Sequence, residues 1–178
     1  MSRNTNLVFK ALEIIAWVIF VGLAIEASAL IVNFFFSILK PEVVGKLYQK
    51  LDLGYLYDYS KFAFFGMYSY IIVIAVLKTV LFYIVIMLIT KLDLAKPFNS
   101  FVAGRIKIIS YYTLIIGLAI LIARASAKHL EHHGVNTDVL NQFLTDGQGF
   151  ILMAAVVYVI SAIFSRGVEL QHENDLTV

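Results

Sequence analysis

Two ionisable residues, Glu26 and Lys78, lie well inside long apolar stretches of the sequence and are the first candidates for chemistry. Charged side chains at such positions are costly in lipid and usually face other protein groups. If the two stretches form antiparallel helices, Glu26 and Lys78 reach similar depths, because each helical residue adds about 1.5 Å. The sequence therefore predicts an intramembrane ion pair, either a structural bridge or an ion or proton relay. Because no second pair is present, we favour the structural role.

The spacing around Glu26 predicts which face of its helix points inward. Small and polar residues share a helical stripe with Glu26 at intervals of three or four residues: Gly22, Ala29, Asn33 and Ser37. Such residues recur on one side of a helix, and they allow helices to pack closely in lipid. We expect this polar helix face to lie against a neighbouring helix.

Two histidines offer another kind of chemistry. His129 and His133 are four residues apart, so a helix would place both on one side as weak candidates for zinc ligands. A metalloprotease pattern needs Glu directly after the first His, and Leu130 stands there instead. Residue types and positions alone suggest no Ser-His-Asp or Cys-His arrangement. The sequence predicts no bound metal, no cofactor and no enzymatic activity, with a zinc-dependent enzyme as a distant alternative.

The final segment, residues 165–178, reads SRGVELQHENDLTV and follows an apolar run without any charge. We call it the acidic tail. It gathers side chains that could together hold a basic protein surface: Arg166, Glu169, Leu170, Glu173, Asn174, Asp175 and Leu176. Acidic groups orient the approach of a basic partner, and apolar side chains supply contact area. The alternative is a solvated tail, or one folded back on Arg105 and Lys107.

A segment near the middle of the chain, residues 91–107, is rich in cations, and we call it the basic loop. Its candidate residues are Lys91, Lys96, Pro97, Phe98, Arg105 and Lys107. Pro97 should end the preceding helix, and Asn99 or Ser100 can cap the next one. The cations then stand where a helix enters a membrane leaflet that carries anionic headgroups.

Four apolar segments must position these residues, and they cover residues 12–39, 62–90, 106–123 and 149–164. A helix needs about 20 apolar residues to cross a bilayer, with about 17 as the lower limit. Hydrophobic residues make up 61% of the 178 residues and charged residues only 15%, which excludes a soluble domain. The sequence predicts an all-α integral membrane bundle of four transmembrane helices in a single domain, residues 1–178.

The charge distribution gives a preferred orientation. Four spans place both termini on the same side of the membrane, and cytoplasmic segments carry an excess of Lys and Arg. The basic loop and the cations before the first span favour cytoplasmic termini, although the loop after the first span also carries lysines. The net charge of +2 argues against direct binding of nucleic acid.

The KPF of the basic loop, followed by a basic helix start, and the terminal FSRGVELQHENDLTV resemble one bacterial family. This is the membrane-protein family known as domain of unknown function 2975 (DUF2975). The resemblance implies four spans across essentially the whole chain, with the basic loop and the acidic tail in the cytoplasm. Members of this family are commonly encoded beside a very small helix-turn-helix regulator.

The resemblance and the tail chemistry together predict a function. A helix-turn-helix protein is basic where it meets phosphate, so it complements the acidic tail. We expect a non-enzymatic anti-transcription factor in the bacterial cytoplasmic membrane that sequesters such a regulator. Membrane lipids are further expected partners, and a homodimer would match the two-fold symmetry common among these regulators. The alternative is a small transporter or channel that uses Glu26 and Lys78.

Overall fold

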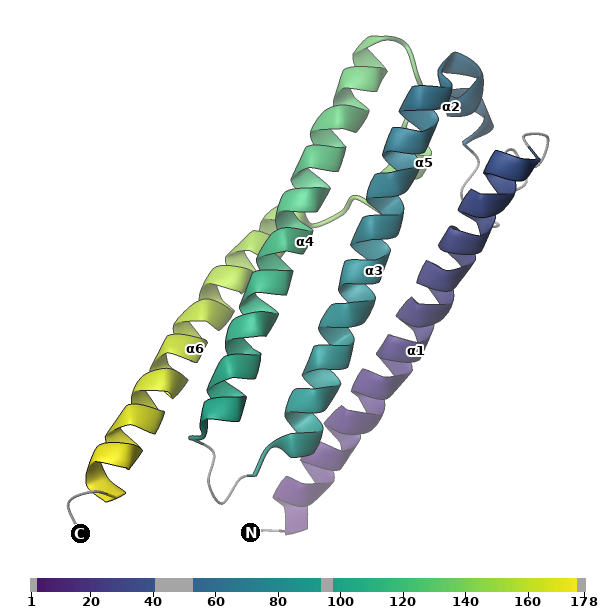
Figure 1. Ribbon diagram of the computed structural model, residues 1–178. Helices are drawn as coiled ribbons and strands as arrows, with labels where there is room; N and C mark the ends of the chain where they lie inside the picture. Colours follow the sequence, from purple (N-terminus) through teal and green to yellow (C-terminus); the bar gives the residue numbers. More distant parts are fainter. Residues whose placement is uncertain (1–2, 41–52, 94–97, 176–178) are drawn as a thin grey trace.

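The computed structural model describes residues 3–40, 53–93 and 98–175, and the regular structure in these ranges is helical. The long helices are α1 (Arg3–Leu39), α3 (Lys61–Lys91), α4 (Ser100–His132) and α6 (Gly147–Asp175). The short helices in the connections are α2 (Gly54–Tyr59) and α5 (Asp138–Asn141). Figure 1 shows the long helices side by side.

The long helices are apolar enough and long enough to cross a membrane. Large hydrophobic side chains cover their outward surfaces, as at Val18, Leu152 and Ile163. Lipid accommodates such surfaces, and a helix satisfies its backbone hydrogen bonds internally, as the bilayer core requires. The described residues therefore form an all-α membrane protein with four transmembrane helices, which confirms the fold class predicted from the sequence.

The long helices pack in chain order, with α1 against α3, α3 against α4, and α4 against α6. Figure 1 shows the resulting row, in which α1 forms one edge and α6 the other. The start of α1, the end of α3, the start of α4 and the end of α6 lie at one end of the molecule, which we call the terminal end. This end therefore gathers the basic loop and the acidic tail.

A buried tyrosine fixes the register of α1 on α3. The Tyr68 hydroxyl donates a hydrogen bond of 3.1 Å to the Leu30 carbonyl oxygen, and its ring stacks on Phe34 with centroids 5.2 Å apart. Tyr68 and Leu30 are fully buried. A buried hydroxyl without a partner costs about 1–3 kcal/mol, so sliding one helix along the other would be penalised.

Glycines bring α4 and α6 close together. A Cβ atom on Gly117 would lie 2.7 Å from Cγ1 of Ile151 and 3.0 Å from the carbonyl oxygen of Gly147. A Cβ atom on Gly147 would lie 2.9 Å from Cγ2 of Ile120. Small residues allow such close backbone approach, which is a common basis for helix association in lipid.

The connection from α4 to α6 returns into the interior of the protein. Gly134 has φ +80°, a conformation in which glycine commonly terminates a helix, and it follows directly after the C-cap of α4. The chain then runs back along the core, where it buries Val135, Leu140 and Leu144. Because α6 begins beside Gly117, its N-terminus lies near the midpoint of α4.

The helices α4 and α6 are longer than the apolar segments predicted at 106–123 and 149–164. The Asn99 side chain accepts a hydrogen bond of 2.9 Å from the Val102 amide, so α4 begins at Ser100, and the predicted cap is confirmed. The other helix, α6, continues through most of the acidic tail. Hydropathy marks the part of a helix that suits the membrane interior, whereas capping residues decide where the helix begins and ends.

Candidate functional site

Two carboxylates and an aromatic ring gather around Lys78, which lies half-buried on α3. Its ammonium lies 5.7 Å from the ring centroid of Phe150, in the first turn of α6. The carboxylates of Glu26 on α1 and Asp146, directly before α6, act on it electrostatically. This cluster lies near the middle of the helices, where a low dielectric strengthens interactions between charges.

The structure places Glu26 and Lys78 within electrostatic range, while no salt bridge joins these two described side chains. Sequence reasoning missed Asp146. A signal for it was present, because an Asp-Gly step directly before an apolar run is a common helix start. Asp146 has φ +62°, a left-handed conformation that Asp tolerates better than most residues. Its approach to Lys78 depends on the returning connection, which hydropathy does not reveal.

The polar helix face of α1 is buried unevenly. Ser37 is buried, and its hydroxyl donates to the Phe34 carbonyl oxygen at 2.7 Å. Asn33 is half-buried, as is Glu26. Gly22 is exposed, and a Cβ atom there would meet nothing within 4 Å. Close packing therefore involves the later part of this face rather than its start.

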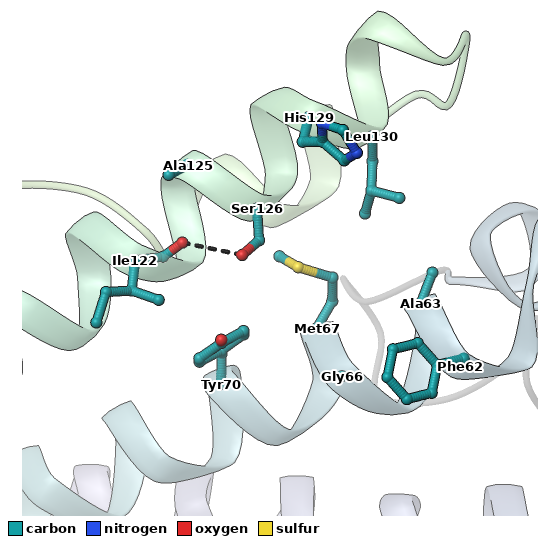
Figure 2. Close-up of a pocket in the computed structure, with 10 residues that line it drawn as sticks. All are labelled: Phe62, Ala63, Gly66, Met67, Tyr70, Ile122, Ala125, Ser126, His129 and Leu130. Atoms are coloured by element: carbon teal, nitrogen blue, oxygen red, sulfur yellow. Dashed lines mark hydrogen bonds between the residues drawn. The ribbon is translucent and has the colours of Figure 1, made fainter.

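A pocket of about 680 Å³ lies between α3 and α4, away from the terminal end (Figure 2). Its lining is mostly apolar and includes Phe62, Met67, Tyr70, Ile122, Ser126 and His129. The Ser126 hydroxyl donates to the Ile122 carbonyl oxygen at 3.1 Å, as Figure 2 shows. None of the lining residues carries a carboxylate or a permanent positive charge. This surface suits an apolar chain better than it suits catalysis.

The two candidate zinc ligands lie at the end of α4. The rings of His129 and His133 have centroids 4.8 Å apart. In the described parts of the chain, no group of three or more His, Cys, Asp or Glu side chains could hold a metal ion. The neighbouring carboxylate of Glu131 accepts a hydrogen bond from Thr137. The histidine pair thus has fewer ligands than a structural zinc site needs.

Aromatic rings hold the cations of the basic loop at the terminal end. Lys91 and Arg105 both lie over the Phe101 ring, with Nζ at 5.3 Å and the guanidinium carbon at 5.2 Å from its centroid. Lys107 lies over Tyr111 at 6.0 Å. Each such contact contributes about 0.5–1 kcal/mol at an exposed site. Because Lys91 belongs to α3, its contact with Phe101 also joins α3 to α4.

Phe98 connects the basic loop to the acidic tail. Its ring centroid lies 5.3 Å from that of Phe164. A Cβ atom on Gly167 would lie only 2.5 Å from Cδ1 of Phe98, so the ring packs directly on the helix backbone. Phe98 of KPF and Gly167 of the acidic tail, far apart in the sequence, therefore meet in space. Lys96 and Pro97, the other two residues of KPF, lie outside the described residues.

The acidic tail continues α6 as a helix through Asp175, so its described part is ordered rather than an unstructured polar segment. One side of this helix packs near the start of α4. Val168, Gln171 and His172 share a small polar cavity there with residues 98–100. The tail is thus oriented by its contact with α4.

The opposite side of the tail is exposed. It presents residues at helical spacings of three and four, namely Arg166, Glu169, Leu170 and Glu173, with Asn174 beside them. The Arg166 guanidinium donates to the Glu169 carboxylate at 2.7 Å. Leu170 is 52% exposed although it is apolar. Leu176 lies outside the described residues, as does the side chain of Asp175. We call Arg166, Glu169, Leu170 and Glu173 the outer side of the tail.

Comparison with known protein families matches residues 46–178 to the family described as "Protein of unknown function (DUF2975)". The match covers α3, α4 and α6, including the contact between Phe98 and Gly167. No curated protein and no solved structure matches the chain. Because the matched residues make up more than half of the sequence, the chain belongs to the DUF2975 family.

Proposed function

We propose that this protein is a non-enzymatic membrane regulator that sequesters a small helix-turn-helix transcription regulator. The observation that supports this function is the helical acidic tail, which is anchored through Phe98 and Gly167 and exposes Glu169, Leu170 and Glu173. A DNA-binding protein carries a basic surface for phosphate. An acidic helix with an exposed leucine complements that surface in charge and adds apolar contact.

The helical form of the tail supports this function further. A disordered segment must lose conformational entropy when it binds, and this loss weakens its affinity. The acidic tail is already ordered by continuity with α6, and its inner side lies against α4. Such pre-organisation lowers the entropic cost of docking.

The proposed location is the bacterial cytoplasmic membrane, with both termini in the cytoplasm. The terminal end carries Lys91, Arg105 and Lys107, and cytoplasmic ends of membrane helices are enriched in such cations. This orientation would place the acidic tail where a DNA-binding protein is found. The small helix-turn-helix protein commonly encoded beside members of the family is the partner we propose.

Charge reversal on the outer side of the tail tests this function. The full chain is expressed together with the helix-turn-helix protein encoded by its neighbouring gene, and the regulator is measured in soluble and membrane fractions. The unmodified chain should recruit most of the regulator to the membrane. Glu169→Lys combined with Glu173→Lys should release it, because opposite charges become like charges across the contact.

The matched control reverses two exposed carboxylates at the opposite end of the molecule, Asp58→Lys with Asp138→Lys. It changes the net charge equally and should leave recruitment unchanged. A regulator that stays soluble beside the unmodified chain would contradict the function. Full recruitment by the tail variant would contradict the docking surface, provided that both variants reach the membrane in equal amounts.

A small transporter or channel is the second candidate function, and the cluster of Glu26, Lys78 and Asp146 favours it. Transporters place titratable side chains and the N-termini of interrupted helices near the middle of the bilayer. The N-terminus of α6 begins near the midpoint of α4, beside this cluster. We rank this function second because the acidic tail and the usual genomic neighbour both favour a protein partner.

A further inference from the structure

An open surface cavity of about 330 Å³ runs along the seam of α4 and α6 near the terminal end, and Arg166 and Glu169 of the outer side of the tail lie at its exposed rim. Lys107 lines it from α4 and Arg166 from α6, and Tyr158, Ser165 and Glu169 contribute further polar groups. Unlike the pocket between α3 and α4, this cavity combines two permanent positive charges with hydroxyl groups. The two cations come from different helices, so the packing of α4 on α6 creates the site.

The charges of this cavity favour an anion. Arg binds phosphate through a planar fork of donors and Lys through a compact positive charge. Arg166 uses Nη1 for its bond of 2.7 Å to Glu169. A guanidinium has five N–H donors, so others remain to reach a phosphate oxygen. Two cations and one carboxylate line the cavity, and the Glu173 carboxylate also acts on Arg166 from outside the lining, so Lys107 is the cation that no salt bridge compensates among the described lining residues.

The position of the cavity selects a membrane lipid as the source of that anion. Lys107 is the second residue of the apolar stretch at 106–123, and Ser165 directly follows the apolar stretch at 149–164. The ends of apolar transmembrane stretches lie at the headgroup layer. Tyr158 lies deeper on α6, and tyrosine rings suit the boundary between headgroups and acyl chains. The cavity therefore lies beside the lipid phosphates.

We propose that this cavity binds the headgroup phosphate of an anionic phospholipid, with Lys107 and Arg166 as its cationic contacts. Basic pockets between transmembrane helices recognise such headgroups. A bound phosphate would place a second anion beside Glu169 on the Arg166 guanidinium. Because Glu169 belongs to the outer side of the tail, a bound lipid would alter the charge presented there. Only the consequence of this change for a docked regulator rests on the proposed function.

Native mass spectrometry of the full chain in detergent, without any regulator, measures lipid binding directly. The probes are phosphatidylglycerol, phosphatidylcholine with the same acyl chains, and inorganic phosphate. Phosphatidylglycerol should bind in preference to the other two. Lys107→Gln and Arg166→Gln should each weaken its binding about fivefold, and together about thirtyfold. The matched control is Arg105→Gln, because Arg105 lies over Phe101 and does not line the cavity.

The control variant should keep its affinity for phosphatidylglycerol. Equal binding of phosphatidylcholine, or an equal loss in Arg105→Gln, would overturn the site. Displacement of phosphatidylglycerol by inorganic phosphate at similar concentration would assign the cavity to a free anion and overturn the lipid assignment. Lys107→Gln serves as the second variant if Arg166→Gln fails to fold, because Lys107 is exposed and takes no part in the bond to Glu169.

Discussion

The contact between Phe98 and Gly167 shows how one residue can set the direction of a whole segment. The aromatic ring occupies the space that any side chain at 167 would need. It also meets Phe164 one turn earlier on α6. This contact holds the first turn of the acidic tail beside the start of α4 and so orients the rest of the tail.

Gly167→Ala should therefore destabilise the protein. The added methyl group would overlap the Phe98 ring, and overpacking costs about 1–3 kcal/mol. Because this ring is exposed enough to shift and Ala favours helix over Gly, we expect a net loss of about 1 kcal/mol. Thermal unfolding in detergent, followed by circular dichroism, measures the loss. Gly104→Ala on α4 is the matched control, since its Cβ atom would meet nothing within 4 Å.

The control should be neutral or stabilising by up to about 1 kcal/mol, because Ala favours helix more than Gly does. An equal loss of stability in both variants would show that the Phe98 contact is not the cause. Adding Phe98→Leu to Gly167→Ala should recover part of the loss, because a smaller side chain leaves room for the methyl group.

At the scale of elements, the pairing of α4 with α6 decides where the last helix begins. Gly117 and Gly147 meet at the start of α6, and the buried connection brings the chain back to that point. As a result, the N-terminus of α6 lies beside Lys78 rather than at the end of the molecule. Helix N-termini carry partial positive charge, so the position of Asp146 next to it is electrostatically favourable.

Gly117→Ala should destabilise the protein more than Gly167→Ala does. The new Cβ atom would approach the Gly147 carbonyl oxygen and the Ile151 amide, and a helix backbone cannot turn aside as an aromatic ring can. We expect a loss of about 2–3 kcal/mol or more, measured by thermal unfolding. Gly66→Ala on α3, where a Cβ atom would meet nothing within 4 Å, is the control. A smaller loss than in Gly167→Ala would contradict the close approach of α4 and α6.

At the scale of the whole molecule, charged side chains lie at both ends of the row of helices and at one level between them. The terminal end carries the basic loop and the acidic tail, whereas Glu26, Lys78 and Asp146 meet near the middle of the helices. These three groups come from α1, from α3 and from the residue before α6. Their charges therefore link α1 and the start of α6 to α3. The link is an electrostatic attraction at a distance rather than a direct salt bridge.

A double-mutant cycle on Glu26 and Lys78 separates a structural role from transport. If the role is structural, Glu26→Gln and Lys78→Met should each lower stability, and the double variant should lose less than their sum. Coupling energies between neighbouring residues are about 0.5–3 kcal/mol.

Thermal unfolding measures the cycle, and pH-sensitive dye in liposomes measures proton flux. We expect the unmodified chain to show no flux above empty liposomes. Flux that Glu26→Gln abolishes would instead establish the transporter function.

The sequence by itself determined the class of protein and several of its local features. Long apolar stretches predict transmembrane helices, because a bilayer leaves few other ways to satisfy backbone hydrogen bonds. Asn99 predicted the start of α4, since a cap depends only on residues within one helical turn. The KPF of the basic loop and the terminal FSRGVELQHENDLTV indicated the family, and the match over residues 46–178 confirmed it. These features depend on residues close in sequence or on composition, and both can be read without knowing the packing.

Only the tertiary structure decided how distant segments meet. It placed Phe98 on Gly167, Asp146 near Lys78, and Lys107 beside Arg166 around one cavity. Hydropathy shows which residues avoid water, but it does not distinguish one inward-facing residue from another. Which inward residues touch depends on how closely two backbones approach. That distance is set jointly by side chains on both helices, so it emerges only when the helices are packed together.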